Sequence, residues 1–232
     1  MKRTLTKEGF TLVELLVVIA IVAVLAALIV PQISKSRQAA LSAKSVANVR
    51  QIFTAFQSYA ADNNGSFPSV TDPTNTYRWQ YQLFPYLMGR DADTSSALLF
   101  NTPFQSPGAI QTLIVKQLGA SNANNSYVYS YGMNAHLPPK TTGSGIDTMP
   151  KLPLSLDHYS STMLLVDSSM SNALLSHPQI KTRLEHGSER YGGKNTVLFC
   201  DGSATMMPFK DLPVGDQTST DPAVQKLWFG RY

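Results

Sequence analysis

Residues 9–31 read GFTLVELLVVIAIVAVLAALIVP, and the rest of the chain is organised around this stretch. Its 21 residues from 10 to 30 include only two polar ones, Thr11 and Glu14. As a helix rising about 1.5 Å per residue it would be about 32 Å long, which is enough to cross a hydrocarbon core of roughly 30 Å. The stretch therefore predicts a membrane-spanning helix.

The residues before the stretch predict its orientation. Three of them are basic: Lys2, Arg3 and Lys7. Basic residues stay on the cytoplasmic side of a membrane, so we expect a cytoplasmic N-terminus and an exported remainder. An ordinary signal peptide has an apolar region of about 7–15 residues followed by small residues at its cleavage site. Here the apolar run is longer and the small residue, Gly9, precedes it, so an ordinary signal peptide fits poorly.

Glu14 is the feature that a plain membrane anchor leaves unexplained. A carboxylate in a membrane segment costs on the order of 2–3 kcal/mol even on lenient insertion scales. Such residues usually have a function, so we treat Glu14 as a candidate site residue.

The stretch resembles the N-terminal signal of type IV pilins and type II secretion pseudopilins. That signal is a short basic leader ending in Gly, then Phe-Thr-Leu-Val-Glu-Leu and an unbroken apolar run. The positions that match it in type and spacing are Gly9, Phe10, Thr11, Leu12, Glu14 and Pro31.

The resemblance implies that prepilin peptidase cuts between Gly9 and Phe10 and then methylates the new amine of Phe10. Gly9 lacks a side chain, so the backbone can lie flat in a protease cleft. The resemblance also implies that Glu14 pairs with the Phe10 amine of a neighbouring subunit. One helical turn separates the two residues, so we expect Glu14 not to neutralise its own terminus easily while it faces outward. Pairing relieves the cost of a buried charge, so Glu14 would set the axial offset between subunits.

The predicted organisation has four parts: a cleaved leader (1–9), a transmembrane and polymerisation segment (10–30), an amphipathic half of the same helix (31–62) and a globular head (63–232). Pro31 predicts a kink. Apolar residues then recur at helical spacing and predict a face packed under a sheet; they are Val49, Ile52, Phe53, Phe56, Tyr59 and Ala60. The helix should run from Phe10 to about Ala61 and end at Asp62-Asn63-Asn64-Gly65, with a left-handed cap at Gly65.

In the head, an aromatic-rich patch precedes a series of short strands. The patch includes Tyr77, Trp79, Tyr81, Leu83, Phe84, Tyr86 and Leu87, and we expect it to be buried against the helix. Residues 109–118 could form a strand or a short helix, and 138–153 a loop. Strands are predicted at 127–131, 162–167, 196–200 and 203–207. Asp201-Gly202 predicts a tight primed turn between the last two. The tail should pack back on the head through Leu227, Trp228 and Phe229.

Residues 192–202, GGKNTVLFCDG, carry a second resemblance. They are similar to the ending of a pseudopilin subgroup marked by His, nine residues and then Asp-Gly, and residues 130–134, SYGMN, also look like that subgroup. Tyr191 stands where the His should be, and the nearest His is His186. The family-motif hairpin therefore rests here on Asp201 and Gly202, and the role of the His is not carried over.

Enzymatic and metal-binding alternatives have less support in the sequence. His186, Asp167 and Asp201 with a Ser could be imagined as a hydrolase triad, but there is no Gly-x-Ser-x-Gly elbow and no His-Glu-x-x-His spacing. Turn and strand-end roles explain both Asp residues. Calcium is a weak alternative, with Asp201 and Asp211 as candidate ligands, because no loop has the oxygen spacing of an EF-hand. We expect no other cofactor and no catalytic residue.

Composition restricts the partners and the way the head is stabilised. The chain of 232 residues has a net charge of +4, which becomes +2 when the leader and its three basic and one acidic residues are removed. This charge, with no basic stripe, does not predict a nucleic-acid partner. Cys200 is the only cysteine and is predicted to be a buried thiol, so no disulfide can form within one chain.

The predicted fold is α+β and pilin-like: a long protruding N-terminal helix, transmembrane in its first half, packed on a small antiparallel sheet. The predicted function is a structural subunit of a type II secretion pseudopilus. A type IV pilus subunit for adhesion, motility or DNA uptake is the alternative, and a signal-anchored envelope enzyme or binding protein is the third. Expected partners are prepilin peptidase, further copies and other pilin-like subunits, and an assembly platform in the inner membrane. The subunit would pass from that membrane into a periplasmic or surface filament.

Overall fold

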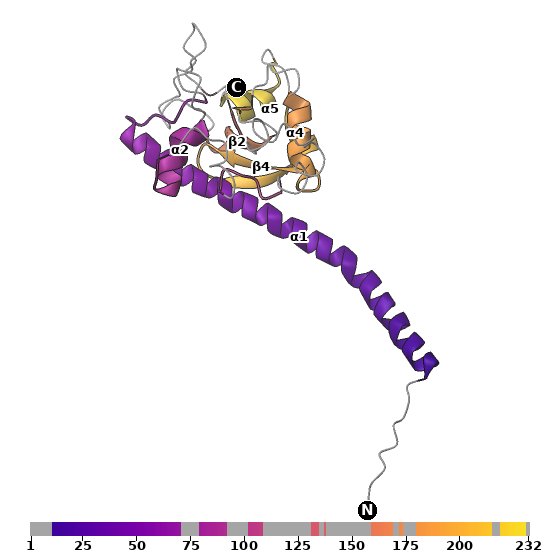
Figure 1. The fold of residues 1–232 in the computed structure, drawn as a ribbon. Helices are drawn as coiled ribbons and strands as arrows, with labels where there is room; N and C mark the ends of the chain where they lie inside the picture. The colour runs from indigo at the N-terminus through magenta and orange to yellow at the C-terminus, as the bar shows by residue number, and fades with distance from the viewer. Residues whose placement is uncertain are drawn as a thin grey trace, which may run out of the picture. The chain divides into compact units, whose positions relative to one another are not determined.

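The computed structural model describes most of the helix and the central sheet of this protein (Figure 1). The described residues are 11–70, 79–91, 102–108, 131–134, 137, 159–168, 172–173, 180–214 and 219–230. The predictions for residues 1–10, 77, 109–118, 127–130 and 138–153 lie outside them. The chain divides into two units, Met1–Ala40 and Leu41–Tyr232, and helix α1 (Leu12–Asp62) contributes to both.

In the first unit, α1 is exposed along its whole length. Every residue from 11 to 40 is solvent-exposed, including the large apolar side chains. The most apolar 18-residue window of this helix has a mean hydropathy of 3.2 and no buried residue, so it is long and apolar enough to cross a membrane. The predicted single helix is thus confirmed from Leu12 onward, with Pro31 inside it. The kink at Pro31 stays a prediction.

In the second unit, α1 ends where the sequence predicts. Its last residue is Asp62, and the next residues form a left-handed cap in which Asn64 has φ 55° and Gly65 has φ 75°. The Gly65 amide donates to the Ala60 carbonyl oxygen at 2.8 Å, a bond of the Schellman type. Asn64 therefore takes the cap position that we assigned to Gly65, and Gly65 follows it with the positive φ that glycine adopts most easily.

In the described residues, the sheet of the head has five strands in the order β3-β1-β2-β4-β5. Their bounds are β1 (Tyr131–Asn134), β2 (Met163–Asp167), β3 (Asn172–Ala173), β4 (Lys194–Phe199) and β5 (Ala204–Pro208). The pairs β1–β2, β2–β4 and β4–β5 are antiparallel, as predicted, whereas β3 pairs with β1 in parallel. The pairing of β2 with β4 shifts between Met163 and Leu165, which places one extra residue in β2.

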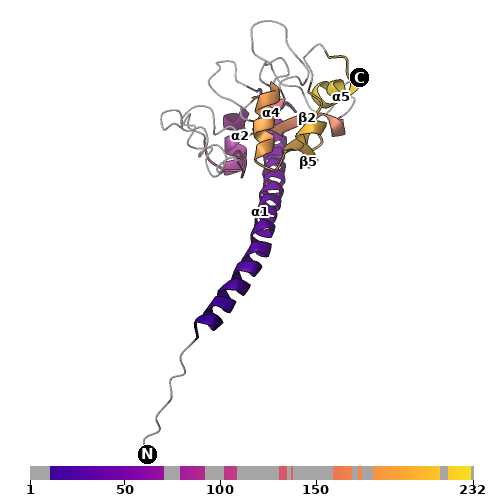
Figure 2. The same ribbon diagram turned by 90° about the vertical axis from the view of Figure 1, so that its right-hand side faces the viewer.

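Each face of the sheet supports its own apolar core, which gives the second unit three layers. On one face, Val49, Ile52 and Phe56 of α1 pack with the side chains of α2 (Trp79–Met88) and with Leu198. On the other face, α4 (Ile180–Glu189), α5 (Pro222–Val224) and the following π-helical turn η4 (Gln225–Phe229) cover Val197 (Figure 2). The described residues also form two short 3-10 helices, η2 (Tyr159–Ser161) and η3 (Phe209–Asp211).

The expected burial of the aromatic-rich patch is confirmed for Trp79, Tyr81, Leu83 and Phe84, whereas Tyr86 and Leu87 are half-buried. Phe56 of α1 stacks on Trp79 of α2 with ring centroids 5.7 Å apart, and Trp79 meets Phe104 edge-on at 5.8 Å. Both tryptophans are fully buried, Trp79 in the core under α1 and Trp228 in the opposite core. The tail therefore packs back on the head, as predicted, through Leu227, Trp228 and Phe229.

The β4–β5 hairpin forms at the predicted place but with a different turn. The Gly202 amide donates to the Phe199 carbonyl oxygen at 3.0 Å, and the Phe199 amide donates to the Ser203 carbonyl oxygen at 2.8 Å. Of the loop residues Cys200, Asp201 and Gly202, only Gly202 has a positive φ, 86°. This is a three-residue loop in which a left-handed glycine forms a bulge, so the predicted two-residue primed turn is wrong.

Gly202 is also required because α1 lies against it. A Cβ atom added there would come within 2.4 Å of the Phe53 ring. Gly193 offers a matched comparison, since it has a similar φ of 84° and nothing within 4 Å of an added Cβ.

We expect Gly202→Ala to destabilise the head more than Gly193→Ala. Both changes add the left-handed strain of about 1–2 kcal/mol, and Gly202→Ala adds about 1–3 kcal/mol because the Phe53 ring must move. The measurement is urea unfolding of the full chain in detergent micelles, followed by the fluorescence of the buried Trp79 and Trp228. Equal losses in the two variants would contradict the close packing of hairpin and helix.

Candidate functional site

Glu14 closes the first turn of α1 together with Thr11. Its Oε2 atom accepts hydrogen bonds from the Thr11 amide and the Thr11 hydroxyl, both at 2.8 Å, and the Glu14 amide donates to the Thr11 hydroxyl at 3.2 Å. This reciprocal pattern is a capping box, which satisfies amides that a helix N-terminus leaves free. The carboxylate thus turns back toward the start of the helix instead of facing outward. The predicted processing residues Gly9 and Phe10 lie outside the described residues.

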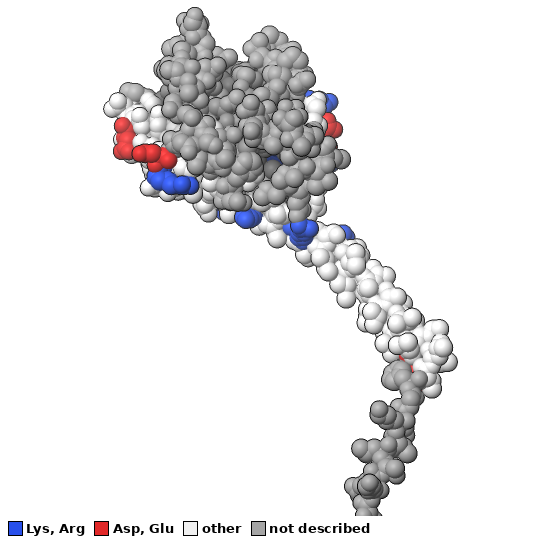
Figure 3. Space-filling model, viewed as in Figure 1, with Lys and Arg blue, Asp and Glu red and all other residues white. Residues whose placement is uncertain are grey.

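The surface that follows Glu14 is apolar until the middle of the helix. From residue 12 to residue 34, Glu14 is the only charged residue, and the next one is Lys35. Figure 3 shows this part of α1 as a white surface with a trace of red at its beginning. A surface of this kind is stable only in lipid or against other apolar helices, because large exposed apolar patches associate in water.

In the head, the predicted calcium ligands are separate local features. The Oδ1 atom of Asp201 accepts from the amide and the hydroxyl of Ser203, at 2.8 and 2.6 Å, and so stabilises the hairpin loop. Asp211 is an exposed residue at the end of η3. Within the described part of the chain, no group of three or more His, Cys, Asp or Glu residues is placed to hold a metal ion.

Tyr191, at the position of the subgroup's His, has a structural role. It is almost completely buried, its hydroxyl shares a hydrogen bond with the Ser106 hydroxyl, and it accepts the Gly108 amide at 3.3 Å. Burial raises the pKa of Tyr191 to about 12, the nearby Asp167 acts in the same direction, and the hydrogen bond with Ser106 acts against it. Tyr191 therefore attaches the 102–108 segment to the turn after α4 as a neutral phenol.

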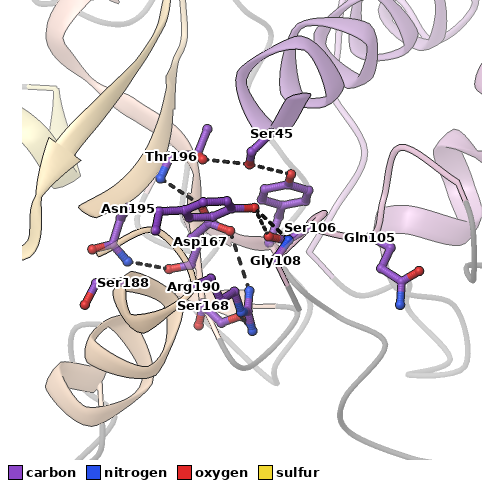
Figure 4. Close-up of polar contacts among 12 residues, drawn as sticks. Ser45, Gln105, Ser106, Gly108, Asp167, Ser168, Ser188, Arg190, Asn195 and Thr196 are labelled. Carbon is purple, nitrogen blue, oxygen red and sulfur yellow. Dashed lines mark hydrogen bonds and ion pairs between the residues drawn. The ribbon is translucent and has the colours of Figure 1, made fainter. Parts of the chain in front are cut away.

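The described part of the head contains a buried polar cluster that the sequence analysis missed (Figure 4). At its centre, Asp167 Oδ1 lies 3.5 Å from Arg190 Nη1, and the two side chains are 0% and 1% exposed. Asp167 Oδ2 accepts the Thr196 amide at 2.7 Å, and Arg190 Nη2 donates to the Ser168 carbonyl oxygen at 3.2 Å. Asp167 is the last residue of β2, in agreement with the predicted strand-end position. Its side chain forms a buried ion pair with Arg190, which the sequence analysis did not predict.

The cluster reaches α1 through hydroxyl groups. The Ser45 hydroxyl shares hydrogen bonds with Tyr131 of β1 at 2.8 Å and with Thr196 of β4 at 2.7 Å. One turn further along α1, Asn48 donates to the Gln105 carbonyl oxygen at 3.2 Å. Ser45 is the first fully buried residue of α1, so the cluster lies where the helix enters the head.

Close backbone packing brings α4 to the same place. A Cβ atom on Gly187 would lie 2.5 Å from the Asp167 carbonyl oxygen, so only glycine lets α4 approach the end of β2 this closely. Asn195 connects the two elements by donating to the carbonyl oxygens of Asp167 at 3.0 Å and Leu184 at 2.8 Å.

Burial determines how Asp167 titrates. It raises the pKa of Asp167 to about 6, because a carboxylate inside the protein loses its hydration; the charge of Arg190 and the Thr196 hydrogen bonds lower the pKa but do not offset this effect. Burial also raises the pKa of Tyr131 well above its ordinary value. Cys200 is fully buried, as predicted, and burial raises the pKa of its thiol.

The residues imagined as a hydrolase triad have other partners. Asp167 pairs with Arg190, Asp201 bonds to Ser203, and His186 lies half-buried on α4. Among the described residues, neither Asp167 nor Asp201 forms a hydrogen bond or ion pair with His186, so the three do not form a triad. A signal for the buried cluster was present in the sequence as polar residues that interrupt apolar patterns: Ser45 and Asn48 in α1, and Thr196 in β4.

Comparison with known proteins identifies the N-terminal segment. The family model of the prokaryotic N-terminal methylation motif matches residues 6–30. This chain carries a type IV pilin-like signal. The signal includes Gly9, Phe10 and Glu14, and it supports a type IV pilin-like or pseudopilin subunit, which suggests a structural role. No curated protein and no solved structure shows significant similarity to the chain.

The pilin-like signal has consequences for the partners and the location of the chain. It implies processing by prepilin peptidase and assembly with other pilin-like subunits. Together with the apolar first half of α1 it fits anchoring in a membrane. The head agrees with this assignment at the level of architecture, since a long N-terminal helix packs on a small, mainly antiparallel sheet.

We expect Ser45→Ala to weaken the head by about 1–3 kcal/mol, because the buried hydroxyls of Tyr131 and Thr196 each lose a partner. Ser58→Ala is the matched control: Ser58 is an exposed residue of the same helix whose hydroxyl donates to the Thr54 carbonyl oxygen, and its loss should change stability by less than about 0.5 kcal/mol. Urea unfolding of both full-length variants in micelles measures the difference. Similar stabilities for the two variants would show that the Ser45 hydroxyl does not hold the helix.

Proposed function

We propose that this protein is a pseudopilin, a subunit of the pseudopilus of a type II secretion system. In this proposal prepilin peptidase removes residues 1–9 and methylates the amine of Phe10. Residues 10–30 anchor the subunit in the inner membrane and later form the filament core, residues 31–62 connect this segment to the sheet, and residues 63–232 form the exported head. The N-terminus starts in the cytoplasm, and assembly on an inner-membrane platform moves the subunit into a periplasmic filament.

The observation that carries the proposal is a single carboxylate on the otherwise apolar and fully exposed part of α1 from residue 12 to residue 30, which lies within a pilin-like signal. The apolar surface has no covering in its own unit, so it needs lipid or other helices. Both are available to a subunit that is stored in a membrane and then polymerised.

Glu14 would give this polymerisation a defined register. In the single chain its carboxylate is satisfied by Thr11, which keeps an ionised group tolerable at the end of a membrane helix. In the filament, the cationic amine of Phe10 from a neighbouring copy would be a stronger partner, because two opposite full charges attract each other strongly in a low-dielectric surrounding and the neutral donors of Thr11 do not add this attraction. Subunits would therefore associate at the offset that brings Phe10 of one copy to Glu14 of the next.

The absence of a disulfide favours secretion over a pilus. Cys200 is the only cysteine and is buried in the head, so the chain has no disulfide-bonded loop near its C-terminus. The mature charge of +2 and the lack of a basic stripe also give no support to a role in DNA uptake. A type IV pilus subunit for adhesion or motility is the second candidate, carried by the same signal.

We expect Gly9→Leu to block processing, because a branched side chain beside the cut bond would prevent the flat backbone that the peptidase cleft needs. Intact-mass measurement of membrane-extracted protein should then find residues 1–9 still attached. Thr6→Leu, which places the same side chain in the leader away from the cut, should give a product that begins at Phe10. A Gly9→Leu product that begins at Phe10 would contradict the proposed cleavage site.

We expect Glu14→Gln to be processed but to assemble poorly. Glutamine can maintain the capping box with Thr11 but carries no charge for the neighbouring amine, so the change separates capping from pairing between subunits. The measurement is the yield of sheared filaments relative to total mature subunit, with Glu185→Gln, an exposed carboxylate on α4, as the control. A filament yield equal to that of the control would eliminate the role of Glu14 in setting the register.

A further inference from the structure

We propose that the buried cluster around Asp167 is a proton-uptake site that tightens the hold of the head on α1 when the surroundings become mildly acidic. This inference concerns the head alone and does not depend on the proposed function.

The geometry of the ion pair is the first argument. Asp167 and Arg190 are both buried, yet a single pair of atoms at 3.5 Å connects them, longer than the roughly 2.7–2.9 Å of a strong charged hydrogen bond. Among the residues that the structure describes, the Oδ1 atom of Asp167 has no hydrogen-bond partner, whereas Oδ2 accepts the Thr196 amide. The charge on this carboxylate is therefore poorly compensated, and a proton on Oδ1 would relieve it.

The surroundings of Asp167 can adapt to a proton. Among the described residues, the charged or titratable side chains that face it are Arg190 and Tyr191 from the turn after α4 and Tyr131 from β1. The other neighbours, Ser45 of α1, Thr196 of β4 and Ser106, contribute hydroxyl groups. Hydroxyls rotate to donate or accept as needed, so a protonated Oδ1 can donate to Ser106 while Oδ2 still accepts the Thr196 amide.

The sign of the effect follows from linkage. Burial raises the pKa of Asp167 from its ordinary value of 3.8 to about 6, so between these values the folded head holds a proton that the unfolded chain releases. The stabilisation is fully present below the unfolded pKa and is lost as the pH rises through about 6. At pH 5 the folding equilibrium should be about tenfold more favourable than at pH 7.5 from this group alone.

The hydrogen-bond chain explains why the effect reaches α1. Asp167 holds the Thr196 amide, the Thr196 hydroxyl bonds to Ser45, and Ser45 also bonds to Tyr131. The first buried turn of α1 is thereby attached to two strands through the residues that surround the titrating carboxyl. Uptake of one proton therefore strengthens the junction between the assembly helix and the head.

The test is urea unfolding of the full chain in detergent micelles at about pH 7.5 and about pH 5, for the native sequence, Asp167→Asn and Asp201→Asn. Asp201 is exposed and accepts hydrogen bonds from Ser203 in its own loop, so its variant is the matched control. We expect the unfolding constant of the native sequence and of Asp201→Asn to fall about tenfold more on acidification than that of Asp167→Asn. An identical pH response in all three proteins would overturn the proposal.

A second measurement decides the question if Asp167→Asn does not fold. The carboxyl carbon of Asp167 in the native sequence can be followed by NMR during a pH titration. A midpoint above about 5 supports proton uptake by the folded head, and a midpoint below about 5, near the ordinary range of an Asp, overturns it.

Discussion

The structure depends on one helix that must satisfy two different apolar surroundings. In its first half, α1 exposes every residue, and fifteen large apolar side chains between Leu12 and Ile33 are 49% to 79% exposed. In its second half, one face of the same helix is fully buried at Val49, Ile52 and Phe56. The first half can be stable only where lipid or other helices replace water, and the second half is stable because the sheet covers it. The position at which one environment gives way to the other is therefore the critical feature of the chain.

Polar contacts mark that position. The first buried turn of α1 presents Ser45 and Asn48, and the fully buried apolar residues of the helix, Val49, Ile52 and Phe56, follow them. Apolar packing alone would allow the helix to slide along the sheet by small steps, because it is not directional. Hydrogen bonds from Ser45 to two strands fix one register, since a shift would leave buried hydroxyls without partners. With Cys200 as its only cysteine, the head relies on such contacts instead of a disulfide.

The sequence was sufficient for the features that depend on periodicity. The long helix, its end near Asp62, the strand β2, the site of the β4–β5 hairpin and the burial of Trp228 follow from runs of apolar residues and from turn residues. The cluster did not follow, because it joins residues far apart in the chain: Ser45 and Thr196 are 151 positions apart. Each of these residues alone looks like an ordinary polar interruption, and only the fold shows that the interruptions meet. The hairpin turn was misassigned because Asp-Gly fits several loops, and the close approach of Phe53 was not visible in the sequence.

The two ends of the degenerate subgroup motif make different contacts, which explains how the chain accommodates Tyr191. Gly202 at one end lets the hairpin loop lie against Phe53 of α1. Tyr191 at the other end bonds to Ser106 and Gly108 and lies beside the Asp167 carboxyl. A change at position 191 therefore alters the support of the 102–108 segment and leaves the contact between hairpin and helix intact. A phenol also remains neutral at any pH at which Asp167 titrates, whereas an imidazole would add a second charge that changes in the same range. With Tyr191, the cluster has one titrating acid near pH 6, and its charge state is set by Asp167 alone.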